Sequence, residues 1–204
     1  MNFVLPWDVS LPAMKTFRVF VTFVLGLAVM LSLGIPKPAM AQSTPSTVRT
    51  ETQPGFSVVG ISVPTTREKE AGGNGEIPQL WQRVMQQGLL ENVPHRTDNN
   101  LTVVYTDYSN DANGEYTYLL GVRVSGVDKV PDGMVVVNVP AGKYAVVPSD
   151  TGSLPEVLPK VWGRISTMSA TELGGQRAFK ADFEVYPENF DWQNAQIDVY
   201  VGLE

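Results

Sequence analysis

The sequence contains one eight-residue pattern twice. Residues 77–84 read IPQLWQRV and residues 158–165 read LPKVWGRI. Both follow the order aliphatic, proline, polar, aliphatic, tryptophan, any residue, arginine, aliphatic, and the two tryptophans lie 81 positions apart. When such a spacing recurs along a chain, it indicates two copies of one supersecondary unit. The repeat constrains the fold more strongly than any other feature of this sequence.

Further segments align at the same offset, and they share a β-branched and aromatic character. They are VVYT at 103–106 with EVYP at 184–187, and YLLGV at 118–122 with VYVGL at 199–203. Upstream of the octets the offset changes, because the glycine-containing segment 65–76 is longer than its counterpart. We expect that segment to be a mobile loop. Even so, GFSVVG at 55–60 resembles GKYAVV at 142–147, so the repeat extends over most of the chain.

Each copy predicts one helix among β-rich segments. The helices are expected at about 78–90 and 154–168, and each has a proline near its first turn, where the missing N–H costs nothing. Alternating apolar and polar residues predict strands around each helix. The strand segments are 56–63, 101–108 and 115–124 in the first copy, and 134–147, 180–187 and 195–202 in the second. We therefore expect an α+β fold of tandem pseudo-twofold β-α-β-β units, with a central ligand cleft between the two halves.

The N-terminal residues have the layout of a secretory signal. Two basic residues precede the apolar run VFVTFVLGLAVMLSLG, and the small residues Ala39 and Ala41 occupy the positions expected at a cleavage site. We expect residues 1–41 to be a signal peptide and the protein to be periplasmic or secreted. An uncleaved membrane anchor is the alternative, although the run is shorter than the ~20 residues that a spanning helix needs. The true start is either Met1 or Met14.

Composition excludes several classes of protein. The chain has no cysteine, which excludes disulfides and a lipoprotein anchor. Removal of the signal takes away three basic residues and one acidic residue, so the net charge changes from −6 to −8. Such a surface repels phosphate backbones, and nucleic acid is not expected as a partner. Residues 42–53 contain almost nothing to bury and are expected to be a flexible linker. This leaves 54–204 as one domain, expected to be a monomer without membrane contact after signal cleavage.

The difference between the two copies at Glu184 is where we look for function. Along residues 181–186 the side chains alternate, and the alanine, phenylalanine and valine are expected to pack under the helices. Glu184 then lies on the other face, where the first copy has Val103. If the non-helix faces of the two halves meet, Glu184 lies in a cleft among aromatic side chains. The candidates are Tyr105 and Tyr200 from the strands and Trp81 and Trp162 from the helices.

A carboxylate among aromatic rings has two chemical uses. Ionised, Glu184 neutralises an organic cation, and the ring faces add to the attraction. With its pKa raised by desolvation, it serves as a general acid or base. A solvated glutamate on an exposed sheet face is the third interpretation. Asp182 and Asp198 are candidates for an acid–base pair with Glu184, although solvated acids at a sheet edge fit these positions as well.

Histidine and cysteine chemistry has little support in this chain. His95 is the only histidine and lies in the polar segment NVPHRTDNN after the first predicted helix. A Ser-His-Asp triad or a multi-histidine metal site is therefore not expected. We expect no metal and no cofactor.

Five short motifs, in order and spacing, resemble those of the GyrI-like effector-binding family. They are I-P-x-L-W at 77–81, V-Y-x-D-Y at 104–108, G-x-Y at 114–116, P-A-G-x-Y-A at 140–145 and F-E-V-Y at 183–186. The resemblance covers about residues 54–204. Domains of this family are carried by many AraC- and MerR-type multidrug regulators and also occur as free-standing proteins.

The resemblance implies tandem β-α-β-β units around a pocket, in which the glutamate of the F-E-x-Y strand contacts cationic, lipophilic ligands. By position this glutamate is Glu184. Some free-standing members are hydrolases that use the same glutamate. We therefore expect extracytoplasmic binding of a small lipophilic, cationic molecule in an aromatic pocket with a central glutamate. The alternative is a hydrolase of the same fold, with Glu184 as general base or acid.

Overall fold

The structure is a computed structural model that describes residues 47–73, 75–109 and 114–204. The predicted signal peptide lies outside this part of the chain. Within it, no helix is long and apolar enough to cross a membrane.

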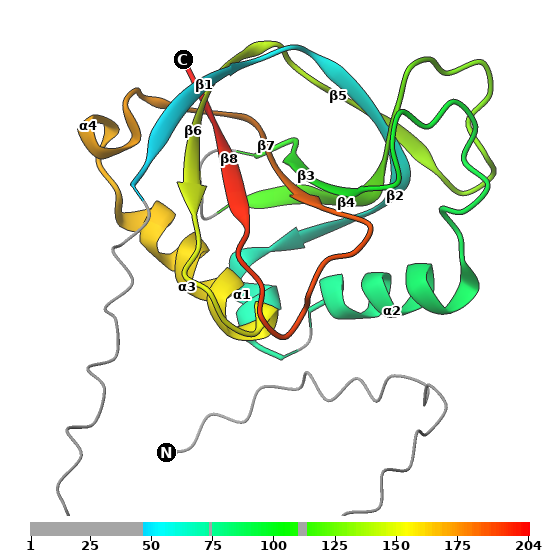
Figure 1. Cartoon of the computed structure of the whole chain (residues 1–204), viewed down its shortest axis with the longest axis horizontal. Coiled ribbons are helices and arrows are strands. Elements are labelled where there is room, and N and C mark those ends of the chain that lie inside the picture. The colour runs from blue at the N-terminus through cyan, green and yellow to red at the C-terminus, as the bar shows by residue number, and fades with distance from the viewer. Residues whose placement is uncertain (1–46, 74, 110–113) are drawn as a thin grey trace, which may run out of the picture.

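The described residues form eight strands and four helices (Figure 1). The strands are β1 (Arg49–Gln53), β2 (Phe56–Thr66), β3 (Leu101–Thr106), β4 (Glu115–Val124), β5 (Val135–Val139), β6 (Gly142–Pro148), β7 (Arg177–Tyr186) and β8 (Asp198–Leu203). The helices are α1 (Arg67–Ala71), α2 (Ile77–Gln87), α3 (Leu154–Thr167) and α4 (Ala170–Leu173).

The two long helices begin differently despite the repeated octet. Helix α2 has Pro78 in its first turn and ends at Gly88, whose left-handed backbone (φ 59°) is typical of a helix C-terminus. Helix α3 instead starts about one turn before its octet, with Pro155 near its first residue and Pro159 inside the helix. The octet therefore marks equivalent positions of the two helices rather than equivalent helix starts.

The sheet closes on itself into a barrel. Its strand order is β1-β6-β8-β7-β3-β4-β2-β5, yet β1 runs almost directly into β2, and β5 into β6. Gln53 pairs with Gly142 and Phe56 pairs with Val139, so the register continues across the bend without an inserted residue. The pairs β1–β6 and β2–β5 are thus one continuous, bent ladder. This ladder joins the two ends of the strand order and closes the barrel (Figure 1).

The two halves join through the antiparallel pair β3–β7. Val103 lies directly opposite Glu184 in this pair, and these residues are equivalent in the sequence repeat. A pseudo-twofold axis therefore passes between them. The predicted α+β fold of tandem β-α-β-β units is confirmed, with Glu184 on the seam between the halves.

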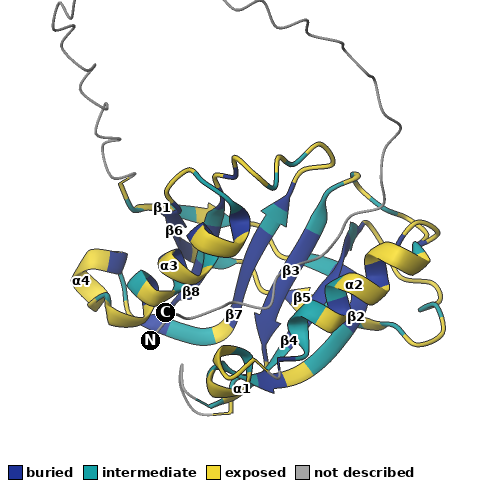
Figure 2. Ribbon diagram, turned by 90° about the horizontal axis from the view of Figure 1, so that it is seen from below, coloured by how far each residue is buried: buried dark blue, intermediate teal, exposed yellow. Residues whose placement is uncertain are grey.

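The prediction about the two faces of residues 181–186 is wrong. Ala181 and Phe183 pack inside the barrel with other apolar strand residues, whereas Glu184 faces the helices α2 and α3. Figure 2 shows both helices on the same side of the strands, with α3 on the left and α2 on the right. The interior of a small barrel is lined only by strand side chains, so it favours apolar ones. The helices instead bring tryptophan N–H groups, from which a carboxylate can accept hydrogen bonds.

Two predicted loops contain regular structure. Residues 49–53 of the predicted linker form β1, which pairs with β6 along its whole length. Its side chains are mostly exposed, so backbone hydrogen bonds hold it and composition gave no sign of a strand. Residues 67–71 of the predicted loop form α1, and the side chain of Thr66 caps it by accepting a hydrogen bond from the Lys69 N–H.

Strands β2 and β4 approach each other closely at a pair of glycines. Gly60 pairs with Gly121, and a Cβ on Gly60 would lie 2.2 Å from the Leu120 carbonyl oxygen. We expect Gly60→Ala to lower the free energy of unfolding by about 2–3 kcal/mol, because the backbone of β4 must move. Urea denaturation measures the change. Gly163→Ala in α3, where a Cβ meets nothing within 4 Å, should instead raise stability by up to ~1 kcal/mol. Similar losses in both variants would contradict the prediction.

Candidate functional site

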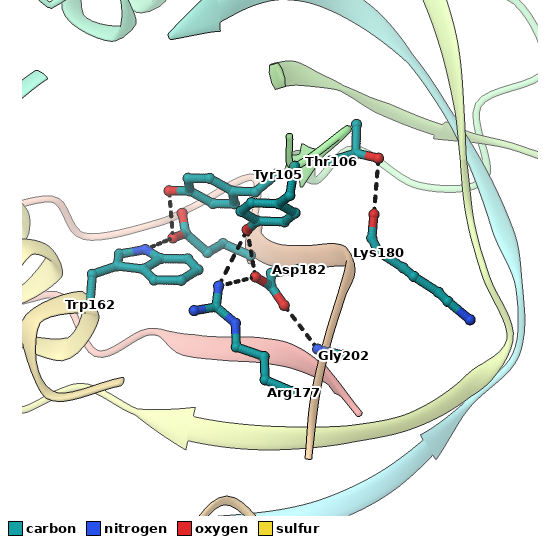
Figure 3. A network of polar contacts seen from close by, with 9 residues as sticks. Tyr105, Thr106, Trp162, Arg177, Lys180, Asp182 and Gly202 are labelled. Carbon is teal, nitrogen blue, oxygen red and sulfur yellow. Dashed lines mark hydrogen bonds and ion pairs between the residues drawn. The ribbon is translucent and has the colours of Figure 1, made fainter. Parts of the chain in front are cut away.

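Glu184 is fully buried and accepts three hydrogen bonds. Its side chain is 0% exposed. The Tyr105 hydroxyl and the Trp162 indole N–H donate to Oε1, at 3.0 Å and 2.6 Å. The Tyr186 hydroxyl donates to Oε2 at 2.6 Å. Figure 3 shows Tyr105 and Trp162 pointing toward the same carboxylate from a strand and a helix.

The sequence repeat explains two of these donors. Tyr105 and Tyr186 are equivalent residues of the two copies, and each donates to a different oxygen of the one carboxylate. The tryptophans break this symmetry. Trp162 donates to Glu184, whereas its equivalent, Trp81, donates to the Tyr118 hydroxyl at 2.8 Å. One carboxylate on the pseudo-twofold axis therefore takes hydrogen bonds from both halves.

Glu184 has only neutral donors around it. Among the described residues it takes part in no ion pair. Burial raises the pKa of Glu184 above its usual value, and the hydrogen bonds from Tyr186, Trp162 and Tyr105 act in the opposite direction. Burial is the larger effect, because a charge loses most of its solvation there. The carboxylate therefore lacks a protein counter-ion, and either a proton or a cationic ligand can neutralise it.

Aromatic rings fill the space around the carboxylate. Tyr105 and Trp162 lie 4.6 Å apart between ring centroids, and Trp81 lies 5.4 Å from Tyr186. Tyr186 also stacks at 5.7 Å on Trp192, from the segment between β7 and β8. These rings cover Glu184 completely, so a ligand reaches the carboxylate only when some of them move.

Of the predicted site residues, Glu184, Tyr105, Trp81 and Trp162 come together. Sequence reasoning missed Tyr186 and Tyr118 as site residues. Tyr186 could have been found, because it is the repeat equivalent of Tyr105. No pattern in the sequence pointed to the Trp81–Tyr118 hydrogen bond, because it joins a helix to a strand 37 positions away.

The structure does not bring Tyr200 to Glu184. Glu184 pairs with Val199 on β8, and strand alternation turns the next side chain into the barrel. Tyr200 there stacks on Phe183, with ring centroids 4.3 Å apart and ring planes 6° from parallel. It also lines a hollow of about 610 Å³ together with Arg49 and other residues. Tyr200 and Glu184 thus lie on opposite faces of the sheet.

The predicted acid–base pairs with Glu184 are not formed. Asp182 is fully buried on the same face, but it pairs with Arg177 and accepts hydrogen bonds from the Tyr108 hydroxyl and the Gly202 N–H. Figure 3 shows the Arg177 and Gly202 contacts. Asp198 forms an ion pair with Arg49 at 2.7 Å. Both aspartates therefore have cationic partners of their own.

His95 lies away from this site. It is exposed, has a left-handed backbone (φ 58°) and contacts Asp128 at 3.0 Å. Its ring therefore contacts an exposed aspartate.

The sequence matches a family model described as "Integron-associated effector binding protein" over residues 49–203. The putative transcriptional regulator protein YobU of Bacillus subtilis is 29% identical over 147 residues, which cover 71% of this chain and 90% of YobU. The transcriptional regulator BrlR of Pseudomonas aeruginosa is 32% identical over 155 residues, which cover 74% of this chain and 53% of BrlR. The chain therefore spans about half the length of BrlR.

Solved structures share the fold. The integron cassette protein VCH_CASS2, from the mobile metagenome of Vibrio cholerae, superposes with a TM-score of 0.60 at 24% identity, covering 77% of this chain and 97% of that protein. The structure of SAV2435 bound to tetraphenylphosphonium superposes with a TM-score of 0.61 at 15% identity, covering 77% of this chain and 93% of that protein.

The raised pKa of Glu184 predicts how stability depends on pH. Between the usual carboxyl pKa and the raised one, the folded state binds more protons than the unfolded state, so this group makes stability fall as pH rises. Glu184→Gln removes that dependence. We expect the variant's unfolding free energy minus that of wild type to increase with pH, by at most about 1.4 kcal/mol per pH unit.

Urea denaturation from about pH 5 to about pH 8 measures this difference. Glu156→Gln, at an exposed position of α3, is the charge-matched control and should follow the wild-type profile. A Glu184→Gln difference that stays constant or shrinks with rising pH would contradict the prediction.

Proposed function

The chain belongs to the family of integron-associated effector-binding proteins, a GyrI-like type of domain, and we propose that it binds a small, lipophilic, cationic molecule at Glu184. Family membership supports the binding of a small-molecule effector. One observation carries the choice of a cation: the buried carboxylate has three neutral donors and no protein counter-ion among the described residues.

The surroundings of Glu184 favour a cation with a large apolar surface. A charge–charge interaction is strong here because few polar groups screen it. Aromatic faces attract a cation by ~0.5–2 kcal/mol each, and more when water is excluded. Tyr105, Trp162 and Trp81 offer such faces within the cluster. A strongly hydrated ion would lose more solvation than these contacts return, so the ligand carries its charge on an organic, poorly hydrated group.

A protein of the same fold agrees with this ligand class. SAV2435 was solved with tetraphenylphosphonium, which is a cation surrounded by four phenyl rings. Tetraphenylphosphonium is therefore a suitable first probe for this chain.

Binding requires the aromatic cover to open. Trp81 and Trp162 come from the helices α2 and α3 and are each partly exposed, so they form the outer side of the cluster. The Trp162–Glu184 hydrogen bond closes the carboxylate from the helix side. A ligand must displace this bond. The measured association constant is therefore the intrinsic one multiplied by the fraction of molecules whose aromatic cover is open.

The N-terminal sequence supports the proposal that this binding takes place outside the cytoplasm. Residues 1–41 have the basic, apolar and small-residue order of a secretory signal. In that setting the domain acts on molecules in the periplasm or the medium.

Charge removal at Glu184 tests the proposed site. Glu184→Gln keeps the side-chain volume, and the hydroxyl of Tyr186 can rotate to accept from the new amide. We expect the affinity for tetraphenylphosphonium to fall by about 2–4 kcal/mol, because a desolvated ion pair is lost. The affinity for triphenylphosphine oxide, a neutral molecule of similar shape, should fall far less. Isothermal titration calorimetry measures both.

Glu156→Gln is the control for the change in net charge and should bind both molecules as wild type does. Equal losses for the cation and the neutral molecule in Glu184→Gln would show that the electrostatic role is wrong. Consumption of the ligand or of an electrophilic ester, followed by NMR, would favour the hydrolase alternative instead.

Processing can be tested independently of binding. We expect the exported protein to begin at Gln42, because Ala39 and Ala41 fit the positions before a signal cleavage site. Intact mass measurement of protein from the extracytoplasmic fraction checks this. Recovery of the uncleaved chain from membranes would favour the anchor alternative.

A further inference from the structure

A buried cation lies close to Glu184 but is held by a different carboxylate. Arg177 is almost fully buried and pairs with Asp182, two residues before Glu184 on the same face of β7. Its guanidinium carbon lies 5.9 Å from the centre of the Trp162 ring, and Trp162 donates to Glu184. Trp162 therefore contacts both Arg177 and Glu184. Figure 3 shows Trp162 beside the Arg177–Asp182 pair.

A local distortion of β7 places Arg177 on this face. Residues five apart point to opposite sides of a regular strand. The pairing of β7 with β8 shifts register between Arg177 and Asp182, and Phe179 within the shift has a left-handed backbone (φ 51°). This conformation is uncommon for a residue other than glycine. The shift turns Arg177 toward Asp182, and the guanidinium also lies 4.5 Å from the Phe179 ring.

Asp182 is fixed by the backbone as well as by Arg177. Its Oδ1 accepts from the Gly202 N–H at 2.9 Å, and Oδ2 accepts from Tyr108 and Arg177. A Cβ on Gly202 would lie 2.7 Å from the Ala181 carbonyl oxygen, so a side chain there would disturb this approach. Asp182 is thus a rigid anchor for a long, flexible cation.

The charges of this cluster do not balance. Asp182 and Arg177 neutralise each other, whereas an ionised Glu184 has no partner within the described residues. Side chains two residues apart on a strand lie about 7 Å from each other, which an arginine side chain can span. Arg177 is therefore a protein cation close enough to take the place of an external cation at Glu184.

We propose that Asp182 is a positioning residue that keeps Arg177 away from Glu184 and thereby leaves the Glu184 carboxylate free for an external cation. The proposal rests on the proposed function, because it explains why that site is selective for cations. Without Asp182, Arg177 pairs with Glu184 and the site becomes electrically neutral. Its preference for cationic ligands is then lost while its aromatic surface remains.

Asp182→Asn tests this arrangement. The substitution keeps the volume and the Oδ1 acceptor for Gly202, and it removes the charge that holds Arg177. We expect the affinity for tetraphenylphosphonium to fall at least about tenfold, and the affinity for triphenylphosphine oxide to change little. The double variant Arg177→Met/Asp182→Asn has no internal cation, so its affinity for tetraphenylphosphonium should return to within about twofold of wild type.

If adding Arg177→Met restores the affinity, Asp182 acts by positioning Arg177. Simple structural damage would not be repaired by a further substitution in the core. Tenfold weaker binding in the double variant, or wild-type binding in Asp182→Asn, would overturn the proposal. If Asp182→Asn does not fold, tenfold weaker binding in the double variant would still overturn the proposal, because that variant has no internal cation to occupy Glu184.

A crystal structure of ligand-free Asp182→Asn gives an answer that does not depend on any ligand. The expected result is the Arg177 guanidinium within hydrogen-bonding distance of Glu184. A guanidinium that stays in its wild-type place would overturn the proposal. If wild type does not bind tetraphenylphosphonium, the proposed function fails, while this structure still decides where Arg177 goes.

Discussion

The site depends on one carboxylate that is buried at the seam between the two halves and forms no ion pair with any residue that the structure describes. Each half of the molecule supplies a tyrosine to it, and these tyrosines are equivalent in the repeat. A buried charge of this kind is costly unless its hydrogen-bonding capacity is met. The tandem arrangement meets it, because the β3–β7 seam brings the two equivalent side chains to the same point. The remaining imbalance is one of charge, and the proposed preference for a cationic ligand rests on it.

The two faces of the barrel wall have different physical tasks. The inner face holds the closed sheet together mainly through apolar residues such as Val104, Leu119 and Phe183, and its half-buried Arg123 lies over the Phe56 ring. The outer face, under the helices, carries the buried carboxylates of Asp182 and Glu184 and the hydroxyl and indole groups that donate to them. Because the barrel interior is packed separately, rearrangement of the aromatic rings around Glu184 does not require the sheet to open. This arrangement is compatible with the proposed entry of a bulky ligand from the helix side.

Much of the fold was predictable from local patterns. The repeat gave the order of helices and strands, because each copy carries the same alternation and the same helix signals. The site was predictable in part for the same reason: Glu184 stood out as a carboxylate at a position where the first copy has a valine. Strand β1 was missed because backbone pairing with β6 holds it, and RTETQ has no apolar pattern to show. The place of Arg177 was also hidden, because a register shift overrides the alternation on which such reasoning depends.

The sequence by itself determined that two β-α-β-β units exist, that Val103 and Glu184 are equivalent, and that Glu184 shares a strand face with Asp182 and Tyr186. These properties follow from periodicity and internal repetition, which are local. Only the tertiary structure decided which face the helices cover, because alternation separates two faces without saying what packs on either. That choice put Tyr200 on the inner face of the barrel and Trp162 against Glu184. Closure of the sheet decided which face the helices cover. The barrel interior is lined only by strands, so it accepts Phe183, whereas Glu184 needs a hydrogen-bond donor from a helix.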